Sequence, residues 1–250
     1  IRTEIGNSNR WEKLYTLSER DVAGYTPYFY NLQYWQNPNT LDSIILINTQ
    51  MFHWERYATN GWDGSLERSD IIAYNLTKRK VEWKIDSICK VSNNGSQFIL
   101  DGNYMYFLTD SKSIKINLLN PNEQLYFYDT FGAFGIVDRE HNRMIGQSLG
   151  ISSVALDEKQ VYWKYEDPAF GSNGFDLFEG YVYVSDDHGA LYVFNAETGK
   201  IVFKERPPGM MWNTSDFGMQ GKISVDRAHR LLYCSDSWGT YCLKLPDKWE

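Results

Sequence analysis

Short apolar runs separated by polar, turn-forming residues recur along this chain, and the clearest example lies between Phe178 and Arg206. Three runs rich in β-branched and aromatic residues, 181–185, 190–195 and 201–205, are separated by turns that contain Gly, Asp or Asn. Runs of this length and composition, interrupted by turn-forming residues, are typical of β-strands joined by tight turns. The segment therefore predicts an antiparallel meander and not a helix.

The same strand–turn–strand step recurs along the chain. In each copy a strand ends at an anchor residue, and a turn and a second strand follow. We place the anchors at Asn75, Asn117, Leu156, Asn195 and Lys244, which lie 42, 39, 39 and 49 residues apart. A period of ~40 to 50 residues is typical of the four-stranded blades of β-propellers. The sequence thus predicts an all-β fold, a β-propeller with five four-stranded blades, in a single domain that spans residues 1–250.

The predicted blades occupy residues 25–86, 97–130, 134–167, 175–206 and 222–245. The last blade lacks an outer strand, because Pro246 and the end of the given sequence follow its third strand. The segment 10–17 has the composition of an outer strand and stands alone before the first blade. We expect it to pair with 239–245 and to close the ring, which would remove two open sheet edges. A part of a larger ring is the alternative.

Residues 189–205, GALYVFNAETGKIVFKE, resemble the repeat of the quinoprotein-type (PQQ-like) β-propellers. In that repeat a strand ending in Asp/Asn-Ala runs through a Thr-Gly-Lys turn into a strand with Trp or Phe. The resemblance covers most of residues 70–245 and implies the fold, an architecture like that of WD40 propellers. The dehydrogenases of the family are longer, eight-bladed rings with a calcium site and commonly an adjacent pair of cysteines. This chain has no adjacent cysteines, so we expect a small non-enzymatic member without PQQ or another cofactor.

Composition narrows the functional classes further. The formal net charge of −7 repels a phosphate backbone, and no basic stripe offsets it, so we expect no nucleic-acid partner. No run approaches the ~20 apolar residues that span a bilayer, so we expect a soluble monomer without membrane insertion. The three cysteines are too few for a disulfide framework and are expected to be thiols. The sequence begins at Ile1, which suggests that a native N-terminus is missing and leaves the compartment, cytoplasmic or secreted, open.

Candidate catalytic groups are few. The four histidines fall on non-neighbouring blades, so we expect no metal site. Five-bladed propellers include glycoside hydrolases, which need two facing carboxyl groups ~5 to 10 Å apart. Asp176 and Glu179 are the nearest candidates, but Glu179-Gly180 also reads as a turn. We therefore predict no catalytic residues, with a glycoside hydrolase-like enzyme as an alternative.

Two loops exceed what the fold requires, namely 55–70 and 207–221, and long loops in rigid folds commonly carry function. Both are expected on one face of a closed ring, where their aromatic and apolar residues would form a protein-binding surface. The predicted binding residues are Trp62, Asp63, Met210, Met211, Trp212, Phe217 and Met219. Pore filling by these residues, a glycan ligand stacked on the aromatic rings, and a binding face on the opposite side around Arg139 and Arg227 are the alternatives.

Overall fold

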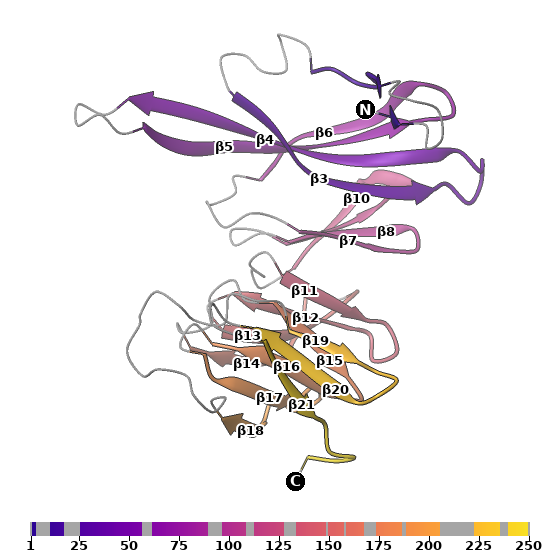
Figure 1. Ribbon diagram of the computed structural model, residues 1–250. Helices are drawn as coiled ribbons and strands as arrows, with labels where there is room; N and C mark the ends of the chain where they lie inside the picture. Colours follow the sequence, from indigo (N-terminus) through magenta and orange to yellow (C-terminus); the bar gives the residue numbers. More distant parts are fainter. Residues whose placement is uncertain are drawn as a thin grey trace. The chain divides into compact units, whose positions relative to one another are not determined.

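The computed structural model describes residues 2–3, 11–17, 26–56, 62–89, 97–108, 113–127, 134–148, 150–157, 159–167, 174–186, 189–205, 223–235 and 240–249. These residues form the strands β1 to β21, and the described part of the chain contains no helix (Figure 1). Two compact units contain residues 1–93 with 117–122, and residues 94–116 with 123–250. Each unit is described by itself, and the single-domain organisation stays a prediction.

The first unit is built on the antiparallel sheet β3–β4–β5–β6. Its strands are β3 (Thr26–Gln36), β4 (Ser43–Arg56), β5 (Trp62–Asn75) and β6 (Lys80–Cys89). The two central strands carry fully buried apolar residues such as Leu46 and Ile71. The two short strands β1 (Arg2–Thr3) and β2 (Trp11–Glu12) pair with each other.

The second unit contains the other sheets, although residues 117–122 of one of them are grouped with the first unit. The first sheet comprises β7 (Gln97–Asp101), β8 (Tyr104–Leu108), β9 (Ile114–Asn117) and β10 (Asn120–Tyr126). The second comprises β11 (Phe134–Asp138), β12 (Arg143–Ser148), β13 (Gly150–Ala155) and β14 (Val161–Glu166). The third comprises β15 (Phe175–Phe178), β16 (Tyr181–Ser185), β17 (Leu191–Asn195) and β18 (Ile201–Glu205). The last comprises β19 (Ser224–Asp226), β20 (Leu231–Ser235) and β21 (Thr240–Lys244).

Three sheets repeat one another at the level of single residues. The aromatic residue of the outer strand pairs with equivalent positions of the third strand, in the pairs Trp83↔Ala73, Trp163↔Ser153 and Phe203↔Val193. In each sheet the register shifts directly after this pair. The three aromatic residues thus occupy equivalent register positions, and all three side chains are half-buried. The anchor predicted at Leu156 was wrong by one residue. Ala155 pairs with Arg143, the first residue of β12, as the anchor Asn195 pairs with Tyr181, the first residue of β16.

Neighbouring sheets of the second unit pack face to face through their apolar side chains. Ile145 and Ile151 of one sheet share a buried cluster with Val182, Val184 and Phe194 of the next. A second cluster joins the sheet β15–β18 to the sheet β19–β21. Face-to-face packing of successive meanders is the arrangement of propeller blades.

The predicted closing pair of strands is not confirmed. Within the described residues β2 pairs with β1, and β21 is the third strand of a three-stranded sheet. Residues 13–17 lie outside the strands, and Leu14, Tyr15 and Leu17 pack against a buried cluster of β4 and β5. No described sheet is closed.

Candidate functional site

Trp62 and Asp63, two of the predicted binding residues, are the first residues of β5. The interpretation of 55–70 as a loop was wrong, because β4 continues to Arg56 and β5 begins at Trp62. The other predicted binding residues, Met210, Met211, Trp212, Phe217 and Met219, lie outside the described part of the chain. Their grouping with Trp62 stays a prediction.

β4 and β5 form a hairpin that extends past both of their neighbours in the sheet (Figure 1). The last pair of β3 with β4 is Thr26↔Phe52, and the last pair of β6 with β5 is Cys89↔Ser69. The hairpin continues beyond these to the pair Arg56↔Trp62. We call residues 52–56 and 62–66 the arm.

The register of the arm divides its positions between two faces. Cross-strand partners share a face, and successive residues alternate between the faces. One face therefore carries the positions of Phe52, Trp54, Trp62 and Leu66 with Gly64 and Arg56, and the other carries those of His53, Glu55, Asp63 and Ser65. The sequence interpretation missed Phe52, Trp54 and Leu66. Their signal was the alternation Phe-His-Trp-Glu-Arg at 52–56.

A buried polar cluster lies where the arm joins the sheet. Asp70 is fully buried, and its Oδ1 accepts a hydrogen bond of 2.8 Å from the backbone N–H of Ser87. Arg68 Nη2 lies 3.2 Å and Lys84 Nζ 3.7 Å from Asp70 Oδ2. Asn48 donates its side-chain N–H to the carbonyl of Asp70 at 3.2 Å. A buried carboxylate is tolerated only when paired in this way, so the cluster fixes the root of the arm.

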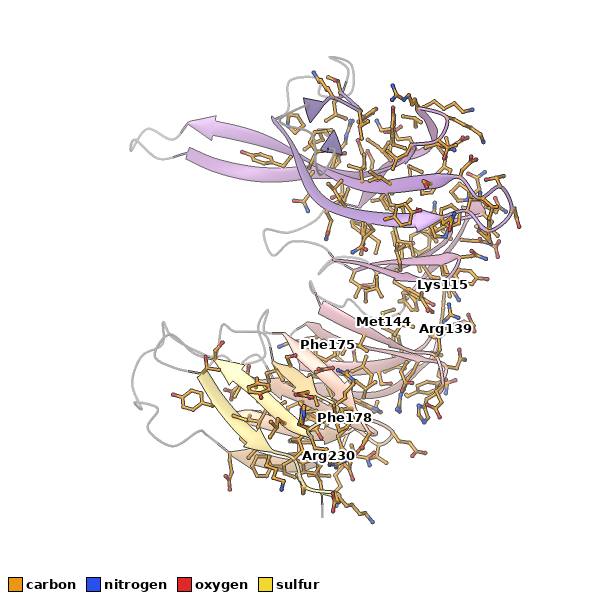
Figure 2. All side chains as sticks on the ribbon, turned by 45° about the vertical axis from the view of Figure 1, so that its right-hand side comes forward. Lys115, Arg139, Met144, Phe175, Phe178 and Arg230 are labelled. Atoms are coloured by element: carbon orange, nitrogen blue, oxygen red, sulfur yellow. The ribbon has the colours of Figure 1, made fainter. Side chains whose placement is uncertain are left out.

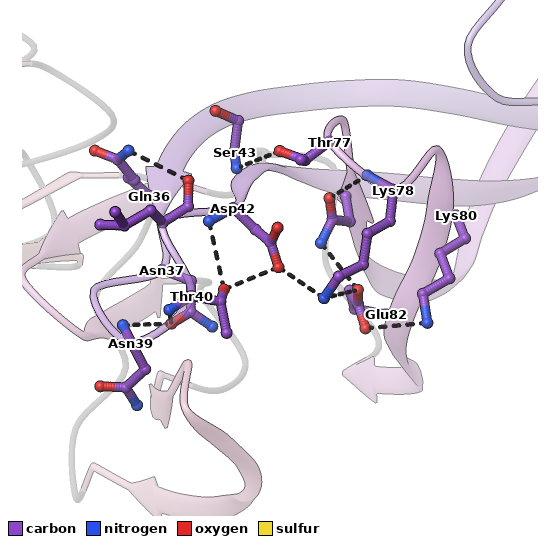
Figure 3. A network of polar contacts seen from close by, with 12 residues as sticks. Gln36, Asn37, Asn39, Thr40, Asp42, Ser43, Thr77, Lys78, Lys80 and Glu82 are labelled. Carbon is purple, nitrogen blue, oxygen red and sulfur yellow. Dashed lines mark hydrogen bonds and ion pairs between the residues drawn. The ribbon is translucent and has the colours of Figure 1, made fainter.

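A second polar network joins the β3–β4 turn to the β5–β6 turn at the other end of the same sheet (Figure 3). Asp42 Oδ2 lies 2.7 Å from Lys78 Nζ, and Lys78 lies 3.3 Å from Glu82. The Lys78 ammonium, with Thr40, holds the pKa of Asp42 below its usual range, and Asp42 raises the pKa of Lys78. Asn75 is fully buried and donates to Glu82 at 2.9 Å. These charges connect the two turns.

The two carboxylates considered for glycoside hydrolysis are held by arginines of the neighbouring sheet. Asp176 Oδ1 lies 2.7 Å from Arg227 Nη2, and its Oδ2 accepts a hydrogen bond from the N–H of Val225 at 2.8 Å. Glu179 accepts two hydrogen bonds from Arg230. The Arg230 guanidinium lies 5.6 Å from the centre of the Phe178 ring, and Figure 2 shows the two side chains together. Both carboxylates serve the junction between sheets.

The two Val-Asp-Arg-x-His segments, 137–141 and 225–229, have the same local structure. The Nδ1 of each histidine lies within 2.9 Å of its own turn aspartate, Asp138 or Asp226. Arg139 pairs with Asp101 of the preceding sheet, as Arg227 does with Asp176. Arg139 and Arg227, which mark the alternative binding face, each form an ion pair between sheets.

Arg143 makes a similar contact between sheets in the interior of the protein. Its side chain is almost fully buried; Nε donates to Asp138 at 2.8 Å and Nη1 to the carbonyl of Ala196 at 2.6 Å. Burial alone would raise the pKa of Asp138, but hydrogen bonds and charge from His141 and Arg143 outweigh it and lower the pKa. The His229 ring, together with backbone N–H groups, lowers the pKa of Asp226. Each aspartate therefore stays ionised and holds its turn.

Among the described residues, no three His, Cys, Asp or Glu side chains group in a way that could hold a metal ion. Cys234 is buried, Cys242 is exposed, and neither forms a disulfide, as predicted. No helix able to cross a membrane occurs in the part of the chain that the structure describes.

Comparisons with known proteins give the fold. No protein-family model matches the sequence, and a search of curated proteins finds no match. Among solved structures, BamB from Moraxella catarrhalis matches with a TM-score of 0.54 and 14% identity, over 88% of this chain and 60% of that chain. A europium-containing methanol dehydrogenase matches with a TM-score of 0.54 and 10% identity, over 78% and 47%. The computationally designed Ika8 protein matches with a TM-score of 0.53 and 6% identity, over 87% and 71%.

The chain therefore spans about 60% of the BamB chain and about half of the dehydrogenase chain that it resembles. At these identities the likeness concerns the fold alone. The sheets, their register and these neighbours show that the chain has an all-β, propeller-like fold.

Proposed function

We propose that this chain is a non-catalytic β-propeller scaffold that binds a protein partner through the arm at 52–56 and 62–66. The observation that carries the proposal is that, among the described residues, the β4–β5 hairpin extends past the last pairs with β3 and β6. A hairpin that projects from a sheet contributes little to the stability of that sheet, because an isolated two-stranded ribbon is marginally stable in water. Its length is better explained by a contact outside the sheet.

The register of the arm supports a protein partner. One face combines two tryptophan positions with a phenylalanine and a leucine, a composition enriched in the central part of protein interfaces. Within the described residues, 53–56 and 62–66 pair with neither β3 nor β6, so a partner strand can pair with either backbone edge of the arm there. The buried Asp70 cluster at the root holds the arm in a defined direction and lowers the entropy cost of binding.

A non-catalytic role is supported by the use of the charged residues. The carboxylates nearest to an acid–base pair, Asp176 and Glu179, are engaged by Arg227 and Arg230.

We also propose that the sheets β3–β6, β7–β10, β11–β14, β15–β18 and β19–β21 are five blades of one closed ring. Face-to-face packing in the second unit supports this arrangement.

The test uses affinity capture followed by measurement with the purified partner. Trp54→Ala and Trp62→Ala should each weaken binding about 30-fold, which corresponds to about 2 kcal/mol. Tyr162→Ala is the matched control, because Tyr162 is an exposed aromatic residue on the outer strand β14. We expect the control to bind as the unsubstituted protein does.

Circular dichroism separates binding from folding in these variants. If both tryptophan variants lose thermal stability and keep their affinity, the arm is structural and the proposal is wrong. If the unsubstituted protein binds members of a glycan array, and Trp54→Ala and Trp62→Ala abolish this binding, the arm is a lectin site.

A further inference from the structure

An extra residue interrupts the pairing of β4 with β5 at the point where the arm begins. Met51 of β4 pairs with Arg68, whereas the next residue, Phe52, pairs with Leu66. β5 therefore has one extra residue, Glu67, between these two pairs. A bulge of this kind bends the strand that contains it and increases the local twist. The arm thus leaves the sheet at a bend.

The other two pairs of neighbouring strands are irregular at the same level of the sheet. β3 has one extra residue, Tyr30, beside Thr49 of β4. β6 places residues 86–88 opposite the single residue Asp70 of β5, which itself pairs with Thr49. All three irregularities therefore lie beside residues 48–52 of β4. Figure 1 shows that β3 is strongly curved.

These three irregularities are not part of the repeat. In the sheets β11–β14 and β15–β18 the described pairs are regular except for one shift, which lies between the third strand and the outer strand. The first sheet has that shift too, between Ala73 and Tyr74. The further irregularities occur in the sheet that carries the arm, and at the root of the arm. They are therefore connected with the arm and not with the blade architecture.

Polar side chains supply hydrogen bonds where the irregular pairing interrupts the ladder. Residues 44–47 of β4 read Ile-Ile-Leu-Ile, whereas residues 48–50 read Asn-Thr-Gln and are buried. The Asn48 side chain donates to the backbone carbonyl of Asp70, and Asp70 Oδ1 accepts from the backbone N–H of Ser87. Ser87 has a left-handed backbone, with a φ of +52°. Buried backbone groups that leave the ladder need such partners, so the buried polar residues hold the irregular backbone in place.

We propose that this line of irregularities is a built-in bend that aims the tryptophan-bearing face of the arm at the partner, and that Glu67 is a positioning residue through its backbone. The inference rests on the proposed binding function and adds what sets the direction of the arm. Without Glu67, Phe52 can still pair with Leu66 and Met51 with Arg68, so each face of the arm keeps its residues. The bulge therefore changes the direction of the arm and not its composition.

Deletion of Glu67 and Glu67→Ala are a matched pair of variants. The deletion removes the bulge, whereas the substitution keeps the extra residue and removes only its carboxylate. With the captured partner, the deletion should weaken binding at least about tenfold, and Glu67→Ala should stay within about twofold of the unsubstituted protein. Equal losses in the two variants would show that the carboxylate contacts the partner and that the bend is unimportant. Unchanged binding by the deletion variant would also overturn the proposal.

A second variant removes the bulge without a deletion. A glycine inserted between Met51 and Phe52 gives β4 a residue opposite Glu67, so that both strands of the hairpin have the same number of residues. The insertion also turns the tryptophan positions to the opposite face of the sheet. It should weaken binding at least as much as the deletion does, and it serves as the test if the deletion variant does not fold. Normal affinity of the insertion variant would contradict the proposal.

Residual dipolar couplings test the bend without a partner. They report the orientation of the amides of 53–56 relative to those of 44–47. This orientation should change by more than about 20° on deletion of Glu67 and should be unchanged in Glu67→Ala. If Trp54→Ala and Trp62→Ala bind normally, the proposed function fails, while changed couplings would still support the bend. Unchanged couplings in the deletion variant would show that the bulge does not aim the arm, and the proposal would fail whatever the partner.

Discussion

The residues that carry the sequence repeat make the contacts between and within the sheets. Asn195 Oδ1 accepts hydrogen bonds from the N–H groups of Glu197 and Thr198, which closes the turn after β17. Gly199 then adopts a φ of +69°, and a Cβ there would lie 2.6 Å from the Trp163 ring of the preceding sheet. The anchor, the glycine and the tryptophan are thus parts of one packing arrangement.

Gly199→Ala should destabilise the fold for two separable reasons. The left-handed backbone costs an alanine about 1–2 kcal/mol, and the collision with Trp163 adds about 1–3 kcal/mol. In a Trp163→Ala background, itself destabilised by about 3–5 kcal/mol, Gly199→Ala should cost only the backbone part. Urea unfolding of the single and double variants measures both.

Gly180 offers a matched control for this cycle. Its φ is +79°, and nothing lies within 4 Å of the Cβ that an alanine would add. Gly180→Ala should therefore cost the backbone part in either background. An equal cost for Gly199→Ala with and without Trp163 would contradict the packing explanation.

Asp138 should make stability depend on pH. Its pKa in the folded state is lowered, so its contribution is present above the unfolded pKa near ~4 and is lost as the pH falls through the folded value. At pH 7, Asp138→Asn should cost about 1–2 kcal/mol, because water screens the exposed side of the carboxylate. The difference from the unsubstituted protein should shrink between pH 5 and pH 3 in urea unfolding. A difference that stays constant over this range would mean that the charge of Asp138 is unimportant.

At the scale of elements, the sequence predicted the tight hairpins well and the arm poorly. The meander at 181–205 has runs rich in β-branched and aromatic residues with Gly and Asn at its turns, and the structure forms strands there. Residues 60–65 read Asn-Gly-Trp-Asp-Gly-Ser, whose turn-forming residues conceal the start of β5 at Trp62. Pairing with β4 determines the strand conformation of that segment, and local composition does not reveal pairing between strands.

The arm should be removable without loss of the sheet. Replacing residues 54–64 by Asn-Gly leaves every pair of β3 with β4 and of β5 with β6 in place. We expect a thermal midpoint within about 3 °C of the unsubstituted protein and loss of partner binding. Asp70→Ala is the contrasting change, because it leaves Arg68 and Lys84 beside an empty buried position and should cost about 3–5 kcal/mol. Unfolding of the shortened variant would show that the arm stabilises the sheet.

At the scale of the whole molecule, the repeat was sufficient to predict propeller-like sheets, because equivalent residues recur at equivalent register positions. The place of the N-terminal segment was harder to predict. Trp11 resembles Trp83 and Trp163 in sequence, yet Tyr15 contacts the Tyr74 face. The choice between two aromatic residues four positions apart depends on packing and not on residue type.

Deletion of residues 1–17 tests the closure of the molecule as a whole. The deletion uncovers Ile47, Ile72 and Tyr74, so the thermal midpoint should fall whether or not the ring closes. Only closure predicts an effect on the sheet β19–β21, where the amides of 240–244 would lose the strand that protects them. Hydrogen exchange followed by mass spectrometry should then show faster exchange in 240–244, unchanged exchange in 191–195, and concentration-dependent aggregation through the open edge. If exchange in 240–244 is the same with and without residues 1–17, the N-terminal segment stabilises the first sheet alone, and the closed ring must be abandoned.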